Sequence, residues 1–211
     1  MIGLTSPYLW YTTRATGLVT LALLTGMVCL GVLVANRAGG ERVGRFELAQ
    51  VHRAVSAITV TFLAIHVVTT VADSFVATGP LSIVVPLTSP YRRVAVGLGA
   101  LALDLLGAVW LSSLLQARLS YSAWRAIHWL GWLCYPAALI HAVSAGTDAR
   151  HGVGLAVVVA SLASVAGAAL WRVTARPDRA AGRTALSPPR RRGLRRPEDA
   201  PRVESGSRTR G

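Results

Sequence analysis

Five apolar stretches, each long enough to cross a lipid bilayer, constrain this chain more than any other feature. A membrane-spanning helix needs roughly 20 mostly apolar residues, and the five stretches cover approximately residues 15–36, 51–72, 94–115, 126–146 and 152–172. Only 15% of the residues are charged, against about 25% in soluble domains. The sequence therefore predicts an all-α integral membrane protein, a bundle of five transmembrane helices.

The arginines predict how these helices are oriented. All 22 basic residues are Arg. If the five stretches alternate across the membrane, 18 of them fall on one side, and the other side holds Arg14, Arg92, Arg93 and Arg150. Because positively charged loops favour the cytoplasmic side, we expect a multi-pass protein of the cell membrane with its N-terminus outside and its C-terminus in the cytoplasm. The opening 17 residues have no charged start and no cleavage site, so we expect the first helix to serve as its own insertion signal.

The last part of the chain, 176–211, differs in composition from the transmembrane domain expected over 1–175. It contains five Pro residues and almost no bulky apolar residues, a composition typical of a disordered segment. Its Arg clusters favour anionic membrane lipid at the cytoplasmic surface. The same charge would suit nucleic acid, but the tail has no aromatic residue to stack on bases, so we expect no nucleic-acid partner.

Four of the five histidines lie inside the predicted spans, where ionisable residues are rare and usually functional. His52 and His66 are 14 residues apart on the second stretch, and His128 and His141 are 13 apart on the fourth. These spacings correspond to rises of roughly 21 and 20 Å. Since both stretches run in the same direction, the four side chains form two layers at matching depths. Two facing imidazoles can supply both axial ligands of a haem iron, so two layers predict two haems.

The azimuth of the histidines is less regular than their depth. A helix turns by about 100° per residue. Two side chains 14 residues apart therefore point to within about 40° of the same direction, whereas two side chains 13 residues apart differ by about 140°. The fourth helix therefore needs a local distortion, or its two haems approach it from different sides. Pro136 lies between its two histidines, and we expect a kink there because proline removes a helix hydrogen bond.

The histidines also suit two roles without haem. They could be polar contacts between helices, in which case the chain would be a non-catalytic membrane scaffold or partner-binding subunit without haem. A non-haem metal site fits less well, because the layers are ~20 Å apart and two His alone rarely complete such a site.

The sequence resembles the ferric-reductase-like transmembrane domain family. The resemblance rests on LWYTTRATGL at 9–18, QVHRAVSAITVTFLAIHVVTTVAD at 50–73, VVPLTSPYRR at 84–93 and SAWRAIHWLGWLCYPAALIHAVSAGTD at 122–148. This family includes ferric reductases, the membrane part of NADPH oxidases and the haem subunit of bacterial methionine-sulfoxide-reducing systems. The resemblance implies two b haems with paired histidine ligands, His52 with His128 and His66 with His141. It also implies electron flow from the cytoplasm to an acceptor outside: ferric iron, dioxygen or a partner reductase.

The chain departs from the family in two respects. Many members have six spans, whereas five are found here. Ferric reductases and NADPH oxidases continue into an FAD- and NADPH-binding module, but no glycine-rich dinucleotide fingerprint follows the fifth stretch. We therefore expect an oxidoreductase component whose electrons come from a separate flavoprotein or from a membrane quinol.

Several charged residues have candidate roles beside the histidines. Haem propionates are anionic, and Arg14 is the best candidate partner on the outside, the alternative being a plain interfacial arginine. Arg92 and Arg93 are further candidates, or they only mark the end of a span. Arg53 and Arg125 flank the inner histidine layer, although membrane topology alone would also place arginines there. Asp104 lies in the middle of the third stretch and is either a proton-handling group or a neutral, hydrogen-bonded acid. The apolar loop at 79–90 contains three Pro residues, so we expect no continuous helix there but either a cap or a short connector.

Overall fold

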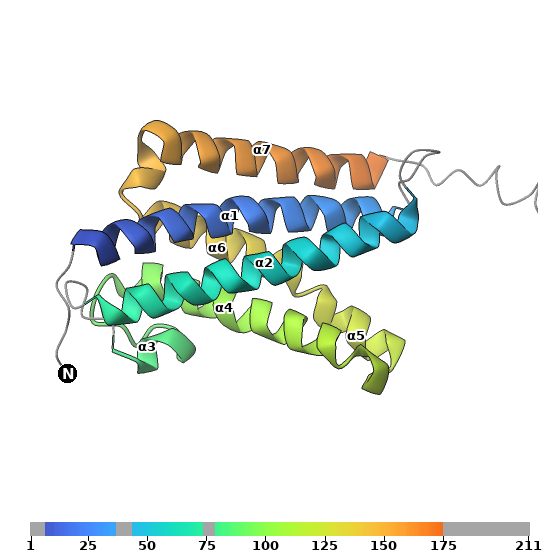
Figure 1. The fold of residues 1–211 in the computed structure, drawn as a ribbon, viewed down its shortest axis with the longest axis horizontal. Coiled ribbons are helices and arrows are strands. Elements are labelled where there is room, and N and C mark those ends of the chain that lie inside the picture. Colours follow the sequence, from blue (N-terminus) through green and yellow to red (C-terminus); the bar gives the residue numbers. More distant parts are fainter. Residues whose placement is uncertain (1–6, 37–43, 74–78, 175–211) are drawn as a thin grey trace, which may run out of the picture. The chain divides into compact units, whose positions relative to one another are not determined.

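Helices of membrane-spanning length make up most of the part of the protein that the structure describes (Figure 1). The structure is a computed structural model that describes residues 7–36, 44–73 and 79–174. The predicted disordered tail lies outside these residues. The helices are α1 (Pro7–Ala35), α2 (Arg45–Ala72), α3 (Leu81–Val84), α4 (Arg93–Leu114), α5 (Tyr121–His128), α6 (Gly131–Ala145) and α7 (Gly152–Thr174), with 3₁₀ turns at Gln116–Arg118 and Asp148–Arg150.

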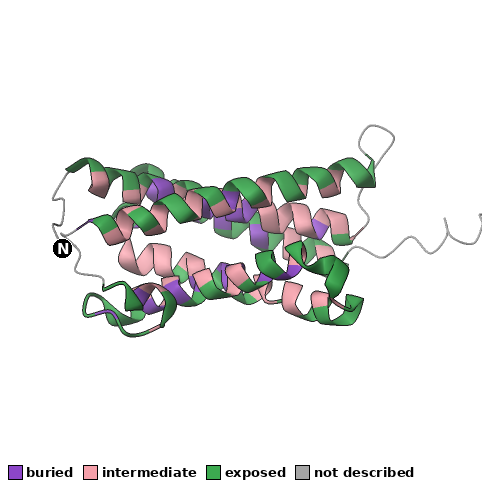
Figure 2. Ribbon diagram, turned by 60° about the horizontal axis from the view of Figure 1, so that its bottom comes forward, coloured by how far each residue is buried: buried purple, intermediate pink, exposed green. Residues whose placement is uncertain are grey.

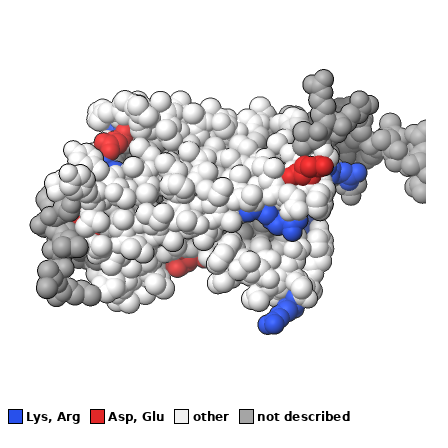
Figure 3. All heavy atoms as spheres, in the orientation of Figure 1, with Lys and Arg blue, Asp and Glu red and all other residues white. Residues whose placement is uncertain are grey.

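The predicted all-α membrane fold is confirmed. Within the described residues, five spans are long and apolar enough to cross a membrane, with α5 and α6 together forming the fourth. Most of the surface drawn in Figure 3 carries no charge, as a surface in contact with lipid hydrocarbon requires. The first two helices start earlier than predicted, at Pro7 and Arg45. A helix can extend beyond the hydrocarbon because its backbone hydrogen bonds are also satisfied in the interfacial region.

The core lies where α1, α4, α6 and α7 meet. Figure 2 shows buried residues spread along the helices, with exposed residues over much of their outer surface. The central cluster consists of Leu24, Ala102, Leu106, Cys134, Tyr135, Ala137 and Val165. The Cys134 thiol donates a hydrogen bond to the carbonyl oxygen of Ala102 over 3.4 Å, which joins α6 to α4 inside this cluster.

Helix α2 is packed differently from the others. It runs along α1, and among the described elements α1 is the one against which it packs closely. Thr59 is its one buried residue. Thr59 lies seven residues after His52 and seven before His66, so the three residues share one face. The histidine rings of this face lie beside Gly31 and Gly17 of α1 and also approach the histidine rings of α5 and α6.

The fourth span is interrupted between its two histidines, on the N-terminal side of Pro136. The break falls at Trp129 and Leu130, and α6 continues through Pro136. Around the break the backbone forms i→i+3 hydrogen bonds, including Trp132 N–H to the Trp129 carbonyl over 3.1 Å. Each such 3₁₀ step turns the chain by about 120° instead of about 100°. The break therefore supplies part of the rotation that the spacing of the two histidines requires.

The segment after α2 folds back against α4. As expected, it is not a continuous helix: α3 is one turn long and packs on α4. Leu87 has a positive φ of 67° and lies over Gly97, where an added Cβ would approach the Leu87 backbone nitrogen to 2.8 Å. Glycine at this position allows the segment to lie directly on the helix.

Candidate functional site

The structure brings the four span histidines together in two pairs. His52 and His66 come from α2, His128 is the last residue of α5, and His141 lies on α6. The ring centroids of His52 and His128 are 6.3 Å apart with an angle of 64° between the ring planes. Those of His66 and His141 are 6.4 Å apart at 73°. We call His52 and His128 the first pair, and His66 and His141 the second pair.

Both rings of the second pair are held by main-chain carbonyls. Nδ1 of His66 lies 2.8 Å from the Thr13 oxygen on α1, and Nδ1 of His141 lies 2.7 Å from the Ala95 oxygen on α4. Because a carbonyl oxygen can only accept, each Nδ1 carries the proton and donates it. The lone pair of each ring is then on Nε2, the arrangement that fixes a histidine as a metal ligand.

Two glycines make room for these rings. A Cβ on Gly17 of α1 would lie 3.0 Å from the Cε1 atom of His66, and a Cβ on Gly99 of α4 would lie 2.7 Å from the Cε1 and Nδ1 atoms of His141. The absence of a side chain thus allows each ring to reach a carbonyl one turn away on the neighbouring helix. Sequence analysis did not identify these glycines, since their role depends on which helices are neighbours.

The first pair is surrounded differently. The His128 ring stacks on Trp124, four residues earlier on α5, with centroids 5.0 Å apart and planes at 30°. His52 lies beside Gly31 of α1, where an added Cβ would be 3.5 Å from its Cε1 atom, an ordinary contact. Nδ1 of His52 and of His128 is buried, with no hydrogen bond of normal geometry to a described residue. The first pair is therefore oriented mainly by stacking and packing, with the main chain of Met27 on α1 interacting with His52, and the second by backbone hydrogen bonds of normal geometry.

The predicted arginine partners occupy different surroundings. Arg14 forms an ion pair with Asp148 and a hydrogen bond with the Thr147 hydroxyl, and its guanidinium carbon lies 4.2 Å from the centre of the Trp10 ring. This network joins the start of α1 to the turn before α7. Arg53 and Arg125 are exposed. Arg53 follows His52 directly, and Arg125 lies on α5, three residues before His128.

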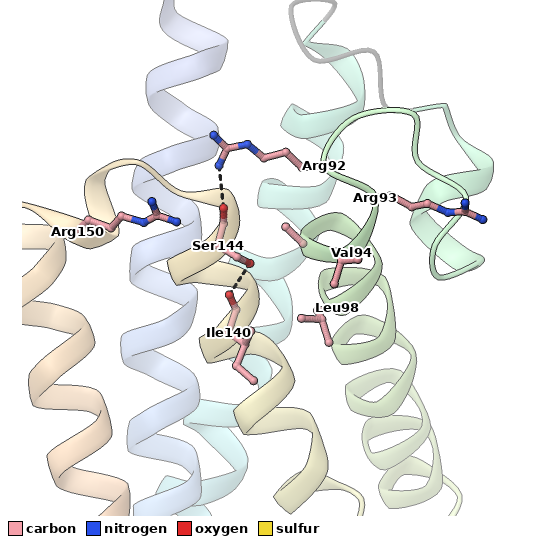
Figure 4. Close-up of a pocket in the computed structure, with 8 residues that line it drawn as sticks. Arg92, Arg93, Val94, Leu98, Ile140, Ser144 and Arg150 are labelled. Atoms are coloured by element: carbon pink, nitrogen blue, oxygen red, sulfur yellow. Dashed lines mark hydrogen bonds between the residues drawn. The ribbon is translucent and has the colours of Figure 1, made fainter.

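Other arginines border an open groove between α4 and α6, shown in Figure 4. Arg92 donates to the carbonyl of Ser144 near the end of α6 over 2.7 Å, while Arg93 turns toward the segment around α3 and donates to the Leu87 carbonyl. A guanidinium at the C-terminus of a helix is favourably placed against its dipole. Arg92 therefore stabilises the end of the helix that carries His141.

A comparison of the sequence with models of known protein families gives a match over most of the membrane domain. Residues 16–139 match the family model described as ferric reductase like transmembrane component. The chain belongs to this family. No curated protein and no solved structure matches it. The family match includes three of the four span histidines and ends two residues before His141, so the place of His141 in the site depends on its geometry beside His66.

Membership identifies the chain as a transmembrane electron-transfer component. It is a multi-pass membrane protein by its five apolar helices and by its family. Within the described residues, no three or more His, Cys, Asp or Glu side chains gather in a way that would hold a metal ion.

Proposed function

We propose that this protein is a b-type cytochrome subunit that binds two haems, one between His52 and His128 and one between His66 and His141, and conducts electrons across the cell membrane. The observation that carries the proposal is the separation of the rings. A metal–imidazole bond of about 2.0–2.1 Å and roughly 1.1 Å from ring nitrogen to ring centre give about 6.3 Å between two rings on opposite sides of one metal ion. The two pairs are separated by 6.3 and 6.4 Å.

Haem also fits the number of ligands. Each pair offers two imidazoles that would hold one haem, and a bound haem would supply one-electron redox chemistry. The protein's own contribution is ligation, orientation and a dry surrounding. In the second pair, the carbonyls of Thr13 and Ala95 keep each Nε2 free to ligate. Along α2 the two ligands are separated by a rise of about 21 Å.

Three arginines near the histidine pairs are the proposed partners of the anionic haem propionates. Arg53 and Arg125 lie within three residues of the first pair in sequence and are exposed, which suits partners for anionic groups near the membrane surface. Arg14 lies on α1 one residue beyond Thr13, whose carbonyl holds His66. Its Nε and one Nη are used by Asp148 and Thr147, and a guanidinium has five N–H donors. Arg14 therefore keeps donors for a propionate.

The direction of electron flow, from the cytoplasm to the outside, is proposed from the family resemblance and combined with the proposed orientation. With the N-terminus outside and the Arg-rich tail in the cytoplasm, the first pair lies toward the cytoplasm and the second toward the outside. The donor would be a separate flavoprotein or a membrane quinol, and the acceptor ferric iron, dioxygen or a partner reductase outside. Membrane lipid surrounds the spans and would hold the basic tail at the cytoplasmic surface.

Absorption spectroscopy of the purified full chain tests this function. After haem-replete expression, we expect bound haem whose spectrum changes on reduction with dithionite and recovers on oxidation. A colourless protein that is nevertheless folded, as judged by its helical circular dichroism, would support the alternative function of a membrane scaffold. That alternative has one observation in its favour: the hydrogen bonds of His66 and His141 to neighbouring helices are themselves polar helix contacts.

A further inference from the structure

Asp104 lies on the outer surface of the bundle. It is near the middle of α4, and its side chain is exposed. No hydrogen bond or ion pair joins it to another residue that the structure describes. A proton-handling role inside the bundle would require the opposite face of the helix, the face on which Gly99 contacts His141. The acid therefore faces the region that lipid occupies around the spans.

An isolated acid at this depth is unfavourable in lipid, and such residues normally have a partner. Among the described residues, the arginines of the spans lie toward the span ends, as Arg14 and Arg53 do, and not at the depth of Asp104. A neutral carboxylic acid, by contrast, both donates and accepts a hydrogen bond. Two such groups can satisfy each other, each O–H donating to the carbonyl oxygen of the other.

The residues around Asp104 form a stripe suited to a second helix. Leu101, Asp104, Ala108, Leu111 and Leu115 are all exposed and follow one another at steps of three, four, three and four residues. This is the spacing of the contact positions in a parallel coiled coil. Nothing lies within 4 Å of the position that a Cβ on Gly107 would take. Small residues at Gly107 and Ala108 would allow two helix backbones to approach closely.

We propose that the α4 stripe is the contact surface of a homodimer, in which Asp104 pairs with Asp104 of a second copy. Two copies inserted in the same orientation have parallel α4 helices with every residue at matching depth. Each contact position then meets its own counterpart, and the two acids meet without any adjustment of register. A single polar contact position in an otherwise apolar stripe fixes such a register. The partner is thus a second copy of this chain.

Site-directed cross-linking in liposomes tests the contact. In the full chain, Ala108→Cys should form an oxidised dimer, whereas the matched control Ala163→Cys, at an exposed position of α7, should show only the background of the native chain, which contains Cys29 and Cys134. Equal cross-linking of the two variants, or cross-linking of Ala163→Cys alone, would overturn the proposal.

The role of Asp104 is tested by the dimer fraction as a function of protein density in liposomes, measured by single-molecule photobleaching. Asp104→Ala should weaken dimerisation by about 3- to 20-fold, while Asp104→Asn, which keeps a self-complementary amide, should retain the dimer. A native chain that stays monomeric at every density, or equal dimerisation of all three proteins, would refute the pairing. Haem content is measured in parallel and should not change, because the stripe faces away from the histidine pairs.

Discussion

Gly99→Ala gives the sharpest test of how the second pair is held. The added Cβ would lie 2.7 Å from both Cε1 and Nδ1 of His141, about 1 Å inside an ordinary carbon contact of 3.5–4.0 Å. The ring has to turn or shift, and it then loses its 2.7 Å hydrogen bond to the Ala95 carbonyl. The lost bond costs about 1 kcal/mol and overpacking about 1–3 kcal/mol. Together they amount to a loss of about 2–4 kcal/mol, which is roughly 30- to 1000-fold in haem affinity.

Haem content per polypeptide in the purified full chain measures this effect. We expect Gly99→Ala to retain one haem, the one at the first pair, where the native chain retains two. Gly31→Ala is the matched control, because its Cβ would make an ordinary 3.5 Å contact with His52 and should leave both haems in place. If Gly99→Ala keeps two haems with unchanged optical and electron paramagnetic resonance spectra, the close approach of α4 to His141 does not position the ligand.

Two further substitutions test the surroundings of the site. Trp124→Leu removes the ring that stacks on His128. Since such stacking is worth about 0.5–1.5 kcal/mol, we expect a roughly 2- to 10-fold loss of affinity for one haem only. The loss should be seen as a change in one of two spectral components. A change in both components would contradict the separate surroundings of the pairs. Cys134→Ala removes a fully buried thiol and its bond to Ala102, and we expect a loss of about 1–2 kcal/mol in stability, measured as a lower melting temperature in detergent with haem content unchanged. An unaltered melting temperature would show that this bond does not stabilise the core.

The sequence was sufficient to predict the spans because the bilayer sets their length and composition. Apolar stretches of roughly 20 residues have little alternative to helix in a membrane. Their ends were less predictable, and α1 begins at Pro7 instead of residue 15. The break in the fourth span at Trp129 and Leu130 was not predicted either. The kink expected at Pro136 stays a prediction, since α6 continues through this residue and a proline can bend a helix without ending it.

Spacing along two helices was enough to predict two layers of histidines, since rise per residue is nearly constant. It could not predict what holds each ring. The carbonyls of Thr13 and Ala95 and the open sides of Gly17 and Gly99 belong to α1 and α4. Their proximity to the rings depends on helix neighbours, which a single sequence does not specify.

The central claim is that each haem is held by one histidine pair, and it is tested most directly by the haem content of double histidine variants. Substituting His52 and His128 together removes both ligands of one site, so the account predicts that one haem per polypeptide remains. Substituting His52 and His66 together removes one ligand from each site, and no haem should remain. One haem retained by the second variant, or none by the first, would show that the ligands are paired differently.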